Sequence, residues 1–146
     1  MVDEQEFRNK VNRLQNLNAQ IEIFENQVEF LKEKIQEHET AKNTMKEYMK
    51  KEEGSELLVP IGASSYLYSR VGSKDKVLIG LGADISAEKN VDEAVDVIDK
   101  RKKEVEDNKE EIQKRLKELE VDAQKLEREV QQEYQQLQQG QQQVQM

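Results

Sequence analysis

The sequence predicts a mainly α protein with a small β insert: an antiparallel two-helix coiled-coil hairpin with two β-hairpins between the helices. Three observations favour this fold. Apolar residues recur every seven positions in both outer parts of the chain, and the middle changes to short β-type runs. Charged residues make up 37% of the 146 residues and hydrophobic residues only 35%, so a thick globular core is not expected. Residues 1–146 are expected to form a single domain, whose three parts differ in hydrophobic period.

The first predicted element is a coiled-coil helix over residues 4–52. One heptad position holds Phe7, Leu14, Ile21, Val28, Ile35 and Met49, and a second holds Leu17, Phe24, Leu31 and Met45. Lys10, His38 and Lys42 interrupt these rows. Six heptads without Gly or Pro are typical of a coiled coil rather than of a short globular helix. Asp3 provides the helix start, and Gly54 provides a left-handed residue after its end.

The second element, residues 55–88, is predicted to form four short strands in two β-hairpins that serve assembly. Short apolar runs alternate with glycine-containing turns, among them Gly72–Asp75 and Gly82–Asp84. Pro60 cannot donate a hydrogen bond to a neighbouring strand, so we expect it at a strand end or edge. Gly80-Leu81-Gly82 is only a fragment of a dinucleotide-binding motif and is interpreted as part of a hairpin.

The third element is a coiled-coil helix over residues 90–138, capped by Asn90 and Glu93. Its heptad positions hold Val91, Ile98, Val105, Ile112, Leu119 and Leu126, with a second, less regular row beside them. If the helices run antiparallel, the heptads fix the sum of two facing residue numbers only modulo seven. A sum of 140, in which Leu14 meets Leu126, is expected because residues 50 and 90 then close the insert symmetrically. The same register brings polar residues into the middle of the pair and predicts looser packing there. The glutamine-rich tail, residues 139–146, is predicted to be disordered.

Composition argues against several classes of function. The sequence has no Cys and one His, and its net charge is −8. We therefore expect no enzyme, no cofactor, no metal site, and no nucleic acid among its partners, because a basic patch is lacking. No apolar stretch is long enough for a membrane span, and the acidic N-terminus is unlike a signal peptide, so no membrane partner and a cytoplasmic location are expected. His38 is interpreted as a half-buried structural residue.

Two sets of apolar residues exceed what the predicted elements can bury. The first lies in the β insert and predicts subunit assembly; it consists of Leu58, Val59, Ile61, Tyr66, Leu67, Tyr68, Val71, Val77, Leu78, Ile79, Leu81 and Ile85. The second lies at the open end of the helix pair and predicts a contact surface for other proteins; it consists of Phe7, Val11, Tyr134, Leu137 and Val144. Fraying with stray apolar residues is the alternative for the second set.

The insert also carries a resemblance to a known family. The runs Leu58-Val59-Pro60-Ile61-Gly62 and Val77-Leu78-Ile79-Gly80-Leu81-Gly82-Ala83, followed by Ile85-Ser86-Ala87-Glu88, lie between two long helices. This arrangement resembles an alpha-class prefoldin subunit of archaeal type, because beta-class subunits have a single hairpin. The resemblance covers nearly the whole chain, although the glutamine-rich tail after Gln138 has no counterpart in the family pattern.

The resemblance implies an ATP-independent chaperone in the cytoplasm. Two alpha-class and four beta-class prefoldin subunits would join through their strands, hold non-native client proteins at the ends of the coiled coils, and pass them to a group II chaperonin. A structural coiled-coil tether or scaffold without client binding is the alternative. A coiled-coil factor acting on a nucleic-acid machine fits less well, because strands fill the bend that such factors use as a working tip.

Overall fold

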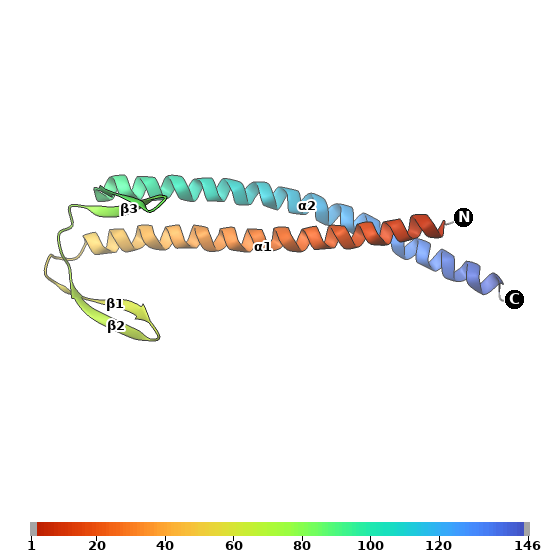
Figure 1. Ribbon diagram of the computed structural model, residues 1–146, viewed down its shortest axis with the longest axis horizontal. Coiled ribbons are helices and arrows are strands. Elements are labelled where there is room, and N and C mark those ends of the chain that lie inside the picture. Colours follow the sequence, from red (N-terminus) through yellow and green to blue (C-terminus); the bar gives the residue numbers. More distant parts are fainter. Residues whose placement is uncertain (1–2, 145–146) are drawn as a thin grey trace. The chain divides into compact units, whose positions relative to one another are not determined.

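The computed structural model describes residues 3–144, and Figure 1 shows the order of its elements. The elements are α1 (Glu4–Met49), β1 (Glu56–Gly62), β2 (Ser65–Arg70), β3 (Val77–Gly82), β4 (Ile85–Lys89) and α2 (Val91–Val144). The chain forms two compact units. The first contains residues 1–32 and 107–146, and the second contains residues 33–106. The predicted fold class, with two long helices and two β-hairpins between them, is confirmed.

Side chains cap the N-terminus of both helices. Asp3 Oδ1 accepts a hydrogen bond of 2.9 Å from the backbone N–H of Gln5. Asn90 Oδ1 accepts one of 2.8 Å from the backbone N–H of Glu93, whose carboxylate accepts a bond from the Asn90 amide in return. These bonds satisfy backbone donors that have no partner inside a helix. The two helix starts predicted from sequence are therefore confirmed.

The C-terminal boundaries differ from the sequence predictions. Helix α1 ends at Met49, three residues earlier than expected, because Lys50 and Lys51 donate to carbonyls three residues back in a tightened last turn. Helix α2 continues to Val144, so it includes residues 139–144 of the segment whose disorder stays a prediction. Glutamine is a good helix former, and Gly140 alone does not end the helix. Residues 145–146 lie outside the described residues.

Each β-hairpin is a separate two-stranded antiparallel sheet. In the first, Leu58 faces Tyr68 and Val59 faces Leu67. In the second, Ile79 faces Ala87. Because side chains alternate between the two faces of a strand, each hairpin has two distinct faces. Pro60 lies inside the pairing of β1 but next to an irregularity in its register and on an edge strand, in accord with its missing N–H.

The two hairpin turns share one backbone conformation. Ala63 and Ser64 have φ of 51° and 56°, and Ala83 and Asp84 have φ of 50° and 59°. Two successive residues in the left-handed region correspond to the turn that matches the twist of paired strands. Each pair follows a glycine with positive φ, and the register shifts there. The turns therefore repeat one another at a spacing of twenty residues.

The helix pair of the first unit is antiparallel and close to the predicted register. The rings of Phe7 and Tyr134 stack with centroids 6.4 Å apart, and their residue numbers add to 141. The Lys10 ammonium pairs with the carboxylate of Glu133, and lies 3.5 Å from that of Glu129. A heptad repeat permits register changes only in steps of seven, so these contacts select the register predicted from sequence. The buried residues of this unit are Val28, Leu119, Ala123 and Leu126.

The second unit contains the other part of the helix pair and both hairpins. Its buried apolar residues are Val71, Ile79, Ala94 and Ile98, of which Ala94 is 0% exposed. Two of these lie in the β insert and two on the first turns of α2. The buried apolar residues of this unit are thus divided between the insert and the start of α2, and most apolar residues of the hairpins are exposed.

Candidate functional site

The first hairpin, β1–β2, exposes apolar side chains on both faces. One face carries Leu58, Tyr66 and Tyr68, and the other carries Val59 and Leu67. Tyr68 is 85% exposed. An isolated two-stranded hairpin is marginal in water, and exposed aromatic side chains are enriched in protein interfaces. This hairpin therefore has the composition of a surface that another polypeptide covers.

The second hairpin, β3–β4, differs because one of its faces is already covered. Ile79 is 4% exposed, and the Arg101 guanidinium donates a 2.7 Å hydrogen bond to the carbonyl oxygen of Gly80. The opposite face leaves Leu78 68% exposed. Lys76 and Glu88 form an ion pair of 3.3 Å between its strands. The hairpin thus rests on α2 with one side and presents the other.

The predicted assembly residues separate into two groups in the structure. Most are exposed: Leu58, Val59, Ile61, Tyr66, Leu67, Tyr68, Leu78, Leu81 and Ile85. Val71 and Ile79 are buried in the chain itself, and Val77 is half-buried. These three residues are therefore less accessible than the other nine in the chain as described. Alternation of apolar residues in the sequence could not separate the two groups, because both occur in strands of the same composition.

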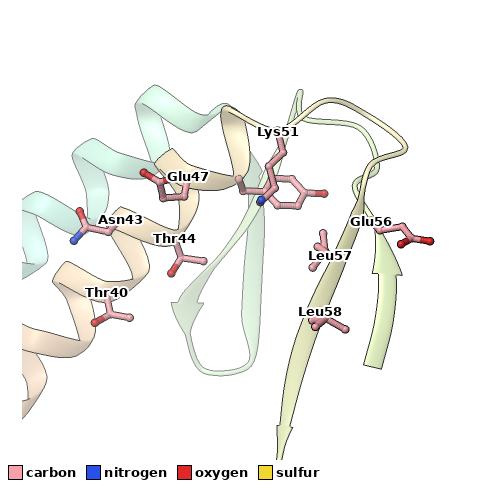
Figure 2. Close-up of a pocket in the computed structure, with 9 residues that line it drawn as sticks. Thr40, Asn43, Thr44, Glu47, Lys51, Glu56, Leu57 and Leu58 are labelled. Carbon is pink, nitrogen blue, oxygen red and sulfur yellow. The ribbon is translucent and has the colours of Figure 1, made fainter. Parts of the chain in front are cut away.

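An open groove separates the end of α1 from β1. Figure 2 shows Thr40, Thr44 and Glu47 on the helix side and Leu57 and Leu58 on the strand side. Its volume is about 620 Å³. Sequence reasoning missed this feature, since the polar residues of α1 had the pattern of a solvated helix face. The groove leaves Leu58 accessible to another chain.

The link between the hairpins is tied to the last turn of α1. The Tyr48 hydroxyl accepts a 3.1 Å hydrogen bond from the backbone N–H of Gly72. The Lys74 ammonium donates to the carbonyl oxygens of Met49 and Lys51. A cation at the C-terminus of a helix also interacts favourably with the helix dipole. These bonds hold both hairpins against the end of the helix.

Two ion pairs cross the helix pair in the second unit. Lys42 Nζ lies 2.8 Å from Asp99 Oδ1, and Lys102 Nζ lies 2.7 Å from Glu39 Oε2. The sequence analysis placed Lys42 as an interruption of an apolar row without naming its carboxylate partner. The available signal was that Glu39–Lys42 and Asp99–Lys102 repeat one spacing on two antiparallel helices. His38 is half-buried, with Nδ1 2.6 Å from the carbonyl oxygen of Lys34.

These ion pairs shift the pKa values of the groups that form them. The hydrogen bond from Lys102 lowers the pKa of the Glu39 carboxyl, and the bond from Lys42 lowers that of Asp99. The bond to Glu39 raises the pKa of Lys102. A lowered carboxyl pKa contributes stability above the ordinary carboxyl pKa and loses it as the pH falls through the folded value. A raised lysine pKa contributes below the ordinary lysine pKa and loses it as the pH rises. The pairs therefore stabilise the fold from about pH 5 to about pH 9.

This window gives a testable expectation. The double substitution Glu39→Gln and Asp99→Asn keeps the shape of both side chains and removes both charges. We expect the variant to have a lower Tm than the parent chain at pH 7, and the difference to shrink as the pH falls below 4 and both carboxylates of the folded parent chain become protonated. The measurement is thermal unfolding followed by circular dichroism. A control with Glu33→Gln and Asp96→Asn, at two exposed sites, should lower the Tm by less. An equal decrease in Tm would contradict the stabilising role of the two ion pairs.

The open end of the helix pair brings together part of the second predicted set. Phe7 and Tyr134 stack, Val11 and Leu137 are half-buried, and Tyr134 is 51% exposed. The Tyr134 hydroxyl also accepts a 2.8 Å hydrogen bond from the Gln138 amide, a contact that the sequence analysis did not predict. The side chain of Val144 lies outside the described residues. The described members form a small aromatic surface beside the ion pairs of Lys10.

Two further properties concern the described residues 3–144. No helix there is both long enough and apolar enough to cross a membrane. No three His, Cys, Asp or Glu side chains of that part are placed to hold a metal ion together.

Comparisons with known proteins agree on one family. The family model described as "Prefoldin subunit" matches residues 17–136. Prefoldin subunit alpha of Methanosarcina barkeri is 32% identical over 107 residues, which cover 71% of this chain and 74% of that protein. Prefoldin subunit alpha of Pyrococcus horikoshii is 35% identical over 91 residues, 62% of each chain. A chain from the cryo-EM structure of filamentous PFD from Methanocaldococcus jannaschii matches with a TM-score of 0.70 and 27% identity, covering 81% of this chain and 98% of that one.

Proposed function

This chain belongs to the prefoldin family of chaperones and to its alpha class, and from this premise we propose a specific mode of action. The chain assembles through its β-hairpins with beta-class prefoldin subunits, as a hexamer of two alpha and four beta chains. The open ends of the helix pairs hold non-native proteins in the cytoplasm without ATP and deliver them to a group II chaperonin.

The observation that carries the assembly step is the exposure of the first hairpin. Both of its faces present apolar side chains, including Tyr68 and Leu67. A sheet with two exposed apolar faces and two unpaired edges becomes stable when other strands and side chains cover it. The second hairpin supports this arrangement, because the Arg101 side chain bonds it to α2 and Leu78 remains exposed.

The holding step rests on the surface around Phe7 and Tyr134. One stacked aromatic pair is too small for tight binding of a client protein. Several such surfaces on one assembly bind the same unfolded chain with high avidity, because each later contact forms at a high effective concentration. Non-native proteins suit this mode, since they expose apolar segments at several places.

Removal of the open end tests the holding step. Deletion of residues 1–11 and 131–146 removes Phe7, Tyr134 and their surroundings but leaves both hairpins intact. We expect suppression of aggregation of a thermally unfolding protein to be lost. Native mass measured on the same sample should remain that of the parent assembly. Full suppression of aggregation by an intact truncated assembly would contradict the proposal.

Two alternatives give different outcomes. A structural tether or scaffold would leave client aggregation unchanged even with the full chain present. A filament is the alternative assembly, because a similar solved chain comes from a filamentous PFD. Native mass after co-expression with a candidate beta-class subunit separates the two assemblies, since a hexamer has one defined mass and a filament has a broad distribution.

A further inference from the structure

The end of α2 has a composition unlike the rest of the chain. Residues 134–144 contain no charged side chain, whereas 37% of the whole chain is charged. The segment is rich in glutamine, and the structure holds it as a helix up to Val144. The side chains of Gln135, Gln138, Gln139 and Gln141 are exposed.

Part of this segment extends past the helix that faces it. In the register set by Phe7 and Tyr134, Glu4 is the first helical residue of α1 and faces residue 137. Within the described residues, no helical residue of α1 faces residues 138–144, which we call the glutamine overhang. The end of α2 in Figure 1, drawn in blue, carries this segment.

The overhang is continuous with the aromatic surface of the open end. Tyr134, Gln138 and Gln141 follow at spacings of four and three residues, which places them on one helix face. The Gln138 amide donates a hydrogen bond to the Tyr134 hydroxyl, so the contact joins the aromatic ring to the overhang. Tyr134, Gln138 and Gln141 thus offer an apolar ring with two primary amides beside it, and none of these three side chains is charged.

We propose that the glutamine overhang, together with Tyr134, binds the backbone of extended and uncharged polypeptide segments. This proposal rests on the proposed function and names the chemical class of client segment that the open end takes. A primary amide donates and accepts hydrogen bonds, as a peptide group does. An unfolded segment exposes unpaired peptide groups whatever its sequence. A neutral surface meets such a segment without the desolvation that charged side chains would require.

A set of alanine substitutions tests the amides without loss of the helix. The variant carries Gln135→Ala, Gln138→Ala, Gln139→Ala and Gln141→Ala, and alanine is the strongest helix former. The probe is a dye-labelled 20-residue peptide of Ser, Asn and Leu, measured by fluorescence anisotropy with the full chain in its native assembly. We expect the apparent Kd to rise about 3- to 10-fold, as for the loss of one or two neutral hydrogen bonds.

The matched control makes the same change elsewhere on exposed helix surface. It carries Gln15→Ala, Gln20→Ala, Gln27→Ala and Gln124→Ala, and its affinity should equal that of the parent chain. A second probe has alternate backbone nitrogens methylated and so lacks half of its N–H donors. N-methylation should weaken binding to the parent chain more than binding to the alanine variant.

Three outcomes would overturn the inference. Equal affinity of the overhang variant and the control, or tighter binding by the overhang variant, would show that apolar contact alone holds the client. A change of native mass in the overhang variant would show that a second copy of the chain covers the overhang. If deletion of residues 131–146 abolishes client holding while the alanine variant retains full affinity, the proposed function stands and this inference falls.

Discussion

Tyr68→Asp is expected to prevent assembly of the chain with its partner subunits. The side chain is the most exposed of the apolar residues of the first hairpin, at 85%. Aromatic residues at the centre of an interface commonly account for at least 2 kcal/mol of binding, which is about 30-fold in affinity. Asp adds the cost of burying an unpaired carboxylate. Native mass of the co-expressed complex should therefore shift to unassembled chains at micromolar concentration.

The neighbouring residue provides a matched control for this substitution. Ser69 lies on the opposite face of the same strand, facing Leu57 rather than Leu58. Ser69→Asp introduces the same charge into the same hairpin and should weaken assembly less than Tyr68→Asp. Circular dichroism of both variants would show that the helices persist. Unchanged native mass for Tyr68→Asp would rule out the face of Leu58 and Tyr68 as an assembly surface.

Residue periodicity was sufficient to predict the helices and the hairpins, and it limited the helix register to steps of seven; the symmetric closure of the insert chose among these steps. The stacking of Phe7 on Tyr134 agrees with the predicted sum to within one residue, although Tyr134 lies on neither heptad row. Both N-terminal caps follow from short local motifs at Asp3 and Asn90. These features depend on residues close in sequence or on a long regular repeat, so they could be predicted from the sequence alone.

Other features depend on spatial neighbours that no local pattern specifies. The sequence marks Leu78 and Ile79 as apolar neighbours on a strand, but it does not indicate that Ile79 is 4% exposed and Leu78 68% exposed in the folded chain. Lys42 interrupts an apolar row in the sequence, while its Asp99 partner lies on the other helix. The tail was predicted disordered from its low complexity, although the helix propensity of glutamine favours the helix found up to Val144.

The second large effect is expected in the core of the first unit. Leu126 is 7% exposed and lies beside Leu17 and Arg13. Leu126→Ala removes buried methyl groups and should lower the free energy of unfolding by about 2 to 4 kcal/mol. The measurement is denaturant unfolding of the full chain at several concentrations, because assembly adds to apparent stability. The control Val121→Ala, at a residue 45% exposed, should change the free energy of unfolding by less than about 0.5 kcal/mol.

A double substitution extends this prediction to the register of the helices. The numbers of two facing residues add to about 140, so Leu14 should contact Leu126. It should not contact Leu119, which lies one heptad, or about 10 Å, away along the helix. The effects of Leu14→Ala and Leu126→Ala should then deviate from additivity by about 0.5 kcal/mol or more, whereas those of Leu14→Ala and Leu119→Ala should add. Coupling of the second pair instead of the first would place the helices one heptad away from the register of Phe7 and Tyr134. Because only the pairing of side chains differs between these registers, the comparison tests the packing of the helix pair independently of the assembly of the chain with its partners.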